Sequence, residues 1–218
     1  MTDFAAARRM MVDNQVRTFD VTDLRIIGAM QELPRERFVA PDQAGLAYLD
    51  MDIPVGKGTP PRHLLKPMTL ARLVQAAEPR ESDHVLDVGC ATGYSAALWS
   101  RLGASVVALE EDAALAKQAG EALTAVKARN VTVVTGPLRA GWPAQAPYDV
   151  ILLNGATDVI PQALCEQLKD GGRLLCVLGR TPGKAMLYRR NGDVSGRTIF
   201  DAAASLLPGF AKIPAFAF

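Results

Sequence analysis

The sequence predicts an α/β protein with a doubly wound, mostly parallel sheet of seven strands, a helical N-terminal extension and an antiparallel C-terminal hairpin. Short apolar runs alternate with helix-like segments from residue 67 to about residue 180. Runs this apolar are typical of parallel strands that helices cover on both faces. Near the C-terminus, Asn191-Gly192 separates two β-like runs, which is a strong local signal for a tight hairpin.

The N-terminal forty residues are expected to be helical. In the run VTDLRIIGAMQEL, apolar residues recur at helical spacing, Thr22 or Asp23 can cap the start, and Pro34 ends the helix. The stretch that follows, LDMDIPVGKGTPPRHLLKP, is rich in Gly and Pro and predicts an extended loop. Pro67 suits the first turn of the next helix, MTLARLVQAAEP.

From residue 84 onward, strands and helices are expected to alternate. The expected strands are HVLDV, SVVALE, NVTVVTG, YDVILLNGA and RLLCVLG, followed by the two runs of the hairpin. The expected helices are GYSAALWSRLG, DAALAKQAGEALTAVKA and IPQALCEQLKDGG. A chain of 218 residues suits one hydrophobic core, so we expect a single domain over residues 1–218.

Composition excludes several function classes. The formal net charge of +1 gives no bulk electrostatic case for binding nucleic acid or a membrane surface. The three cysteines, Cys90, Cys165 and Cys176, are odd in number and form no Cys-x-x-Cys pair. We therefore expect neither a disulfide framework nor a metal site. No apolar run approaches the ~20 residues of a membrane span and no signal peptide is visible, so a cytoplasmic protein is expected.

The loop after the first expected strand is the predicted ligand site. Ligands of doubly wound sheets bind at the carboxyl ends of the strands, where the strand order reverses. Gly89 and Gly93 would let the backbone of this loop turn sharply and approach a ligand. Glu110 ends the second expected strand, 21 residues after Gly89, where a carboxylate can accept hydrogen bonds from a ribose diol.

The acid within the first strand indicates which nucleotide-like cofactor would bind. The loop lacks the G-x-G-x-x-G fingerprint of dinucleotide sites, and Asp87 would repel a pyrophosphate. The same carboxylate suits a cofactor with a cationic amino-acid portion, such as S-adenosylmethionine. The acid-x-Gly-x-x-x-Gly arrangement resembles the first motif of Rossmann-like methyltransferases, with Ala91 in place of their central glycine.

A narrower resemblance extends from about residue 10 to about residue 180. The chain is similar to the protein-L-isoaspartate O-methyltransferase family in DNQVRTFDVTDLRIIGAMQELPRERFVAP, AYLDMDIPVGKGT, GYSAAL and APYDVILLNGATDVIPQALCEQLKDGGRLLCVLG. The resemblance implies an S-adenosylmethionine-dependent enzyme that methylates the carboxyl group of isoaspartyl residues in damaged proteins. It also implies N-terminal helices and a substrate loop in 1–66, a cofactor-binding core in 67–180, and the hairpin and tail in 181–218.

Two positions depart from the family pattern. The family has a serine two residues before the helix proline, treated as its active-site residue, where this chain has Leu65. Leucine cannot donate a hydrogen bond, and Lys66 is the alternative donor to a substrate carboxylate. After the third expected strand, the family's Gly-Asp-Gly, whose acid contacts adenine, is replaced by Gly136-Pro137-Leu138. The residues implied for the cofactor are Asp87, Gly89, Cys90, Ala91, Gly93, Glu110, Pro137, Leu138 and Asn154.

Two other interpretations stay open. The missing serine favours a methyltransferase of the same fold with a different acceptor. A catalytically degenerate member would bind the cofactor without turnover. Nucleic-acid amino methyltransferases place a Pro-Pro-aromatic motif after the fourth strand, where this chain has Asn154-Gly155-Ala156-Thr157, so that class is disfavoured.

Overall fold

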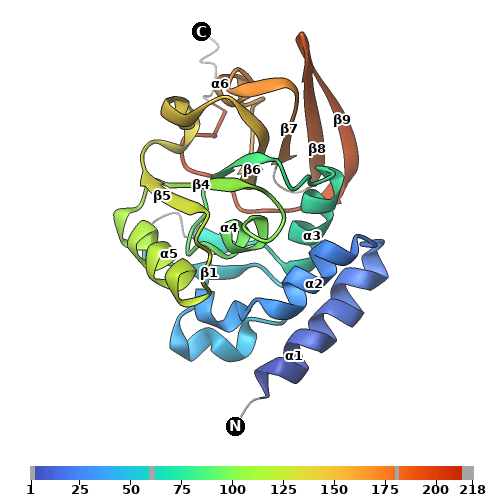
Figure 1. Cartoon of the computed structure of the whole chain (residues 1–218), viewed down its shortest axis with the longest axis vertical. Helices are drawn as coiled ribbons and strands as arrows, with labels where there is room; N and C mark the ends of the chain where they lie inside the picture. The colour runs from blue at the N-terminus through green and yellow to red at the C-terminus, as the bar shows by residue number, and fades with distance from the viewer. Residues whose placement is uncertain (1–2, 59–61, 180–181, 213–218) are drawn as a thin grey trace, which may run out of the picture.

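The computed structural model describes residues 3–58, 62–179 and 182–212. The chain begins with a helical extension, whose two α-helices lie side by side at one end of the molecule (Figure 1). Its elements are α1 (Phe4–Met11), a π-helical turn (Val12–Val16), a 3-10 turn (Arg17–Phe19) and α2 (Leu24–Glu32). Asp23 caps α2 by accepting a hydrogen bond from the Arg25 amide, so the expected helix and one of its two expected caps are confirmed.

The stretch expected to be an extended loop contains two short strands. After two 3-10 turns (Arg35–Phe38 and Pro41–Leu46), β1 (Ile53–Val55) and β2 (Arg62–Leu64) pair as a small antiparallel sheet. These strands were not predicted, because alternation of apolar and polar residues over three positions cannot be distinguished from a loop sequence. In the structure Ile53, Val55 and Leu64 are buried, as the alternation of a strand requires. The helix α3 (Pro67–Ala76) follows, with Pro67 in its first turn as expected.

Within the described ranges, seven strands form the main sheet in the order β5-β4-β3-β6-β7-β8-β9, and this confirms the predicted fold class (Figure 1). The strands from β5 to β7 run parallel, and β8 and β9 continue the sheet antiparallel. The strand bounds are β3 (His84–Val88), β4 (Ser105–Glu110), β5 (Val131–Thr135), β6 (Tyr148–Thr157), β7 (Leu168–Leu178), β8 (Gly183–Asn191) and β9 (Asp193–Ala202). The turn between β8 and β9 is at Gly192, with a positive φ of 70°, so the predicted hairpin is confirmed.

Three further helices alternate with these strands: α4 (Tyr94–Trp99), α5 (Ala113–Ala125) and α6 (Gln162–Cys165). The helix α6 is much shorter than the predicted segment IPQALCEQLKDGG. Leu168 already pairs with Tyr148 in the sheet, and residues 169–172 bulge out before Arg173 pairs with Val150. Residues from Leu168 onward therefore belong to the sheet, although their local pattern predicted a helix.

Both faces of the sheet are apolar and covered. Along β6, Val150 and Leu152 pack on the face shared with Trp99 and the N-terminal helices, whereas Ile151 and Leu153 pack on the other. This alternation follows from the two-residue period of a strand. The parallel strands β3, β4 and β6 are therefore buried on both sides, as their uninterrupted apolar runs predicted, whereas β5 at the edge of the sheet is only partly buried. Among the described residues, none of the helices is long and apolar enough to cross a membrane.

After β9 the chain turns back across the middle of the molecule toward α6 (Figure 1). We call residues 203–212 the crossing segment. It pairs with the carboxyl end of β6, because Ala156 donates its amide to the Ser205 carbonyl at 2.8 Å and accepts from the Leu207 amide at 2.9 Å. Phe210 is fully buried in the core on this side, so the crossing segment covers this part of the core.

Candidate active site

The sheet brings the predicted loop and acids together. The strand order reverses beside β3, so the carboxyl ends of β4, β3 and β6 are neighbours. Gly89 and Gly93 have φ values of 74° and 92°, the left-handed region that glycine adopts at little cost. Ala91 adopts the same region with a φ of 51°. Its side chain is thus tolerated at the position of the missing glycine, with the backbone strain that a Cβ brings there.

Glu110 ends β4 and is fully buried. Its Oε2 accepts from the Ala91 amide at 2.8 Å, and its Oε1 accepts from the amides of Glu111 at 3.0 Å and Asp112 at 3.3 Å. Backbone amides therefore bind both oxygens of the carboxylate. In addition, Arg62 Nη2 of β2 lies 3.0 Å from Oε2 and forms a buried ion pair with it.

Asp87 is also fully buried, near the end of β3. Its Oδ2 accepts from the Ser95 hydroxyl at 2.6 Å, and that hydroxyl in turn accepts from the side-chain amide of Asn154. Asp87 Oδ1 and Asn154 Oδ1 are buried without a partner among the described residues. Burial raises the pKa of Asp87 from its ordinary value of 3.8 to about 7, and the nearby Glu110 adds to this rise against the lowering effect of the Ser95 hydrogen bond.

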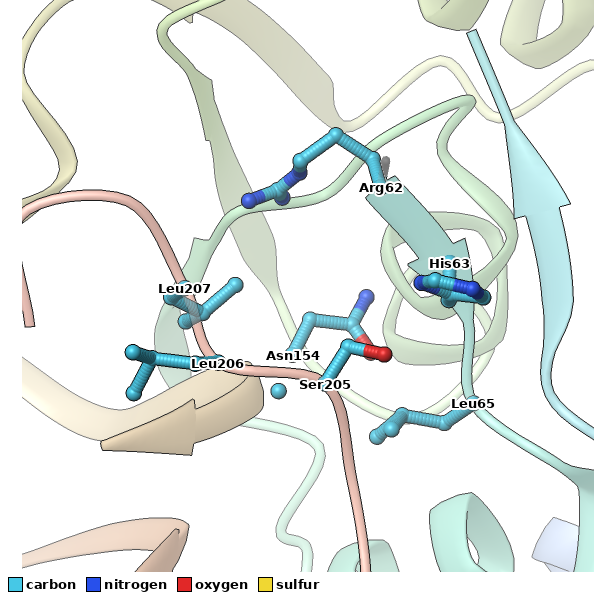
Figure 2. Close-up of a pocket in the computed structure, with 8 residues that line it drawn as sticks. Arg62, His63, Leu65, Asn154, Ser205, Leu206 and Leu207 are labelled. Carbon is cyan, nitrogen blue, oxygen red and sulfur yellow. The ribbon is translucent and has the colours of Figure 1, made fainter. Parts of the chain in front are cut away.

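A narrow cavity of about 10 Å³ lies beside Asn154 and is lined also by Arg62, Leu65 and Leu207, with room for about one water molecule. Two side chains account for its size. Figure 2 shows Arg62 extending from β2 toward Leu207 of the crossing segment. A Cβ placed on Gly89 would lie 2.6 Å from Arg62 Nη2 and 3.1 Å from Leu207 Cδ2. One placed on Gly155 would lie 2.7 Å from the same Leu207 atom, so these two side chains rest directly on the glycine backbone.

Leu65 lines this cavity and is 2% exposed. Its carbonyl accepts from Arg35 Nη2 at 2.8 Å, and the same guanidinium donates to the Ala47 carbonyl at 2.8 Å. Arg35 thereby joins the N-terminal extension to the segment that holds Leu65. Lys66, the predicted alternative donor, lines a separate pocket with Asp201.

Other predicted cofactor residues lie within the loop or follow β5. Cys90 is fully buried, and burial raises the pKa of its thiol well above the ordinary value. Leu138 is fully buried after β5, and its amide lies 3.4 Å from Glu111 Oε2. Pro137 precedes it at the start of a 3-10 turn. Among the described residues, no group of three or more His, Cys, Asp or Glu side chains is placed to hold a metal ion.

Sequence reasoning missed three residues of this site. Ser95, which bonds Asp87, lies in the first turn of the helix after the glycine loop, so its position in the sequence could have indicated it. Arg62 and Leu207 gave no local signal, because they reach the loop only through the tertiary fold. Arg62 is 48 residues from Glu110 in the chain.

The doubly wound sheet and the acids at its strand ends define a nucleotide-type cofactor-binding α/β protein. The family model for protein-L-isoaspartate(D-aspartate) O-methyltransferase matches residues 6–204. The chain belongs to this family.

Relatives and solved structures agree with this assignment. Similar proteins include the protein-L-isoaspartate O-methyltransferase of Methanoregula boonei, 41% identical over 179 residues that span 82% of this chain and 80% of that protein. The enzyme of the same name from Methylorubrum extorquens is 39% identical over 88% of this chain and 83% of its own length. A solved structure titled protein-L-isoaspartate O-methyltransferase superposes with a TM-score of 0.81 at 25% identity, covering 93% of this chain and 66% of that one.

Proposed function

We propose that this protein is an S-adenosylmethionine-dependent methyltransferase that methylates the carboxyl group of L-isoaspartyl residues in damaged proteins and peptides. Membership of the family supports the reaction class. The observation that carries the proposal is the pair of buried oxygens, Asp87 Oδ1 and Asn154 Oδ1, that lack partners among the described residues. Buried acceptors of this kind ordinarily have a donor, and the ammonium group of the cofactor's amino-acid portion would supply one to each.

The remaining residues fit such a cofactor in their chemistry. Glu110 is held by three backbone amides and would accept from a ribose diol. The backbone of Gly89 would lie against the ligand, and Pro137 and Leu138 would flank an adenine through apolar contact. Cys90, Ala91 and Gly93 would shape the loop. The cavity beside Asn154 is too small for such a ligand in the described conformation, since it holds about 10 Å³ and pockets for ligands of this size span ~300 Å³ or more.

The chemistry asks little of the protein beyond positioning. When bound, S-adenosylmethionine supplies an electrophilic methyl group on a sulfonium. An isoaspartyl carboxylate has a reference pKa near ~4 and is ionised at neutral pH, so no general base is required. The residues here would hold the acceptor in line and exclude water. Leu65 contributes an apolar wall in place of the family's serine, and Arg62 places a positive charge in the same cavity.

Leu65 also favours a second candidate, a methyltransferase of the same fold with a different acceptor. Its buried side chain offers no hydroxyl to an isoaspartyl carboxylate.

We further propose that the chain works as one domain over residues 1–218. A cytoplasmic location is supported by three buried cysteines that are all free.

A labelled-methyl assay tests the proposal. Purified protein is incubated with S-adenosylmethionine labelled in its methyl group and an isoaspartyl peptide, and the same peptide with normal aspartate is the control. We expect transfer to the isoaspartyl peptide alone, and loss of transfer in Asp87→Asn, which removes the charge for the ammonium group. Absence of transfer under conditions in which the Methanoregula boonei relative is active would refute isoaspartyl methylation. Transfer to another carboxylate or hydroxyl compound would support the second candidate.

A further inference from the structure

The proposed cofactor site is filled by the protein's own side chains. Arg62 and Leu207 come from opposite parts of the chain and meet over Gly89. Both are buried: the Arg62 side chain is 7% exposed and Leu207 is 4% exposed. They contact Gly89 and Glu110, which are assigned above to the cofactor, and Gly155, which follows the assigned Asn154.

Arg62 takes the place on Glu110 that a ribose diol would need. Its Nη2 donates both to Glu110 Oε2 at 3.0 Å and to the Gly89 carbonyl at 2.9 Å. The carboxylate does not depend on this contact, because backbone amides already bind both its oxygens. Arg62 itself is incompletely bonded, since its Nε and Nη1 are buried without partners among the described residues. A buried cation with unused donors is costly, so this contact is one that a better ligand can replace.

Leu207 fills the space between Gly89 and Gly155. The Leu207 amide donates a hydrogen bond to the Ala156 carbonyl of β6, and this bond holds the crossing segment in place at Leu207. Two backbone hydrogen bonds join the segment to β6 at Ala156, and a third joins Phe210 to Asp158 at 3.0 Å. The Lys212 amide also donates to Asp158 Oδ2 at 3.2 Å. The segment is thus a short added strip of chain at the strand end rather than a full strand, and its displacement would break these bonds and expose Leu207.

We propose that Arg62 and the crossing segment form an internal plug in the cofactor site, and that the cofactor binds by displacing both. This inference rests on the proposed function for the identity of the ligand. The closed and open states then compete, and the apparent dissociation constant equals the intrinsic one divided by the open fraction. A closed state favoured tenfold therefore weakens the apparent affinity about tenfold.

Calorimetric titration with S-adenosyl-L-homocysteine measures this competition without turnover. The variants are Arg62→Ala, which frees Glu110, and Leu207→Ala, which opens the glycine backbone. The matched controls are Arg189→Ala, whose exposed guanidinium pairs with Glu78 away from the site, and Leu24→Ala, whose side chain is 73% exposed. We expect the dissociation constant to fall about tenfold in Arg62→Ala and also to fall in Leu207→Ala, with both controls unchanged.

Amide hydrogen exchange on the wild-type protein gives a second readout that needs no variant. Saturating S-adenosyl-L-homocysteine should speed exchange at the Ala156 and Leu207 amides, because the bonds between β6 and the crossing segment break. Equal or weaker binding in Arg62→Ala together with unchanged exchange overturns the plug and leaves the proposed function intact. If neither wild type nor any variant binds at millimolar ligand, both the plug and the proposed function are wrong. Binding by Arg62→Ala but not by wild type supports the plug, whichever acceptor is methylated.

Discussion

Replacing Asp87 by asparagine should stabilise the protein at alkaline pH. Asp87 is fully buried, and its pKa is about 7 against an ordinary value of 3.8. The folded state thus keeps a proton that the unfolded chain releases near pH 4. Stability therefore falls as pH rises from about 4 to about 7, and the loss persists above pH 7. Asparagine carries no charge at any pH and can still accept from Ser95.

The size of the effect follows from the pKa difference. A pKa difference of about 3 corresponds to about 4 kcal/mol, at 1.36 kcal/mol for each pKa unit. We treat this as an upper limit, since local relaxation hydrates a buried charge. The Asp87→Asn variant should thus match wild type below pH 4 and exceed its unfolding free energy by up to about 4 kcal/mol at pH 8.

Urea unfolding of both proteins at intervals from pH 4 to pH 8.5 measures this difference directly. Asp149→Asn is a control for which we expect the opposite change in unfolding free energy. Burial raises the pKa of Asp149, but hydrogen bonds from Lys169 and the His84 amide outweigh it and lower the pKa below 3.8. Asp149 therefore stabilises the fold above about pH 4, and its replacement should cost stability at neutral pH. Equal unfolding free energies of wild type and Asp87→Asn at pH 8 would refute the argument for Asp87.

Four further changes have definite expected outcomes. Ser95→Ala removes a hydrogen bond that lowers the pKa of Asp87, so the loss of stability should extend to higher pH in the same urea series; an unchanged profile would contradict this. Leu65→Ser should cost about 2–5 kcal/mol, because it removes a 2% exposed leucine and buries a hydroxyl, and calorimetry must confirm folding before any gain of methyl transfer is interpreted. Arg173→Ala should cost about 3–5 kcal/mol, since Arg173 pairs with Asp83 at 2.6 Å and both side chains are 2% exposed. The exposed Arg189–Glu78 pair should cost under about 1 kcal/mol when Arg189 becomes Ala, and equal losses for the two pairs would contradict this reasoning.

The parts of the fold that local sequence encodes were predictable. The strand β4 was expected over the residues that form it, because SVVALE is an uninterrupted apolar run that ends in an acid. The glycine loop and Glu110 followed from spacing alone, since both lie at strand ends. The helix α6 was predicted too long, because pairing of Leu168 with Tyr148 is a tertiary contact that a local pattern cannot contain.

The occupants of the site were not predictable for the same physical reason. Arg62 lies in a Gly- and Pro-rich stretch with no periodicity, and Leu207 lies in the C-terminal tail, whose sequence gives no sign of contact with the glycine loop. Their meeting at Gly89 depends on how β2 and the crossing segment pack against the finished sheet. The sequence pattern thus predicts the glycine loop and the acids at the strand ends, but it does not predict that Arg62 and Leu207 lie against them.

The raised pKa of Asp87 links the plug to ligand binding. The Asp87 carboxyl is fully buried, and desolvation is the largest contribution to its raised pKa. Displacement of the plug would have two opposed effects on this pKa, because hydration of the strand ends would lower it and loss of the Arg62 charge would raise it. An ammonium group bound beside Asp87 would replace the Arg62 charge and favour the ionised carboxyl. Ligand binding would therefore favour the charged form of Asp87, whereas burial in the closed site favours the neutral form.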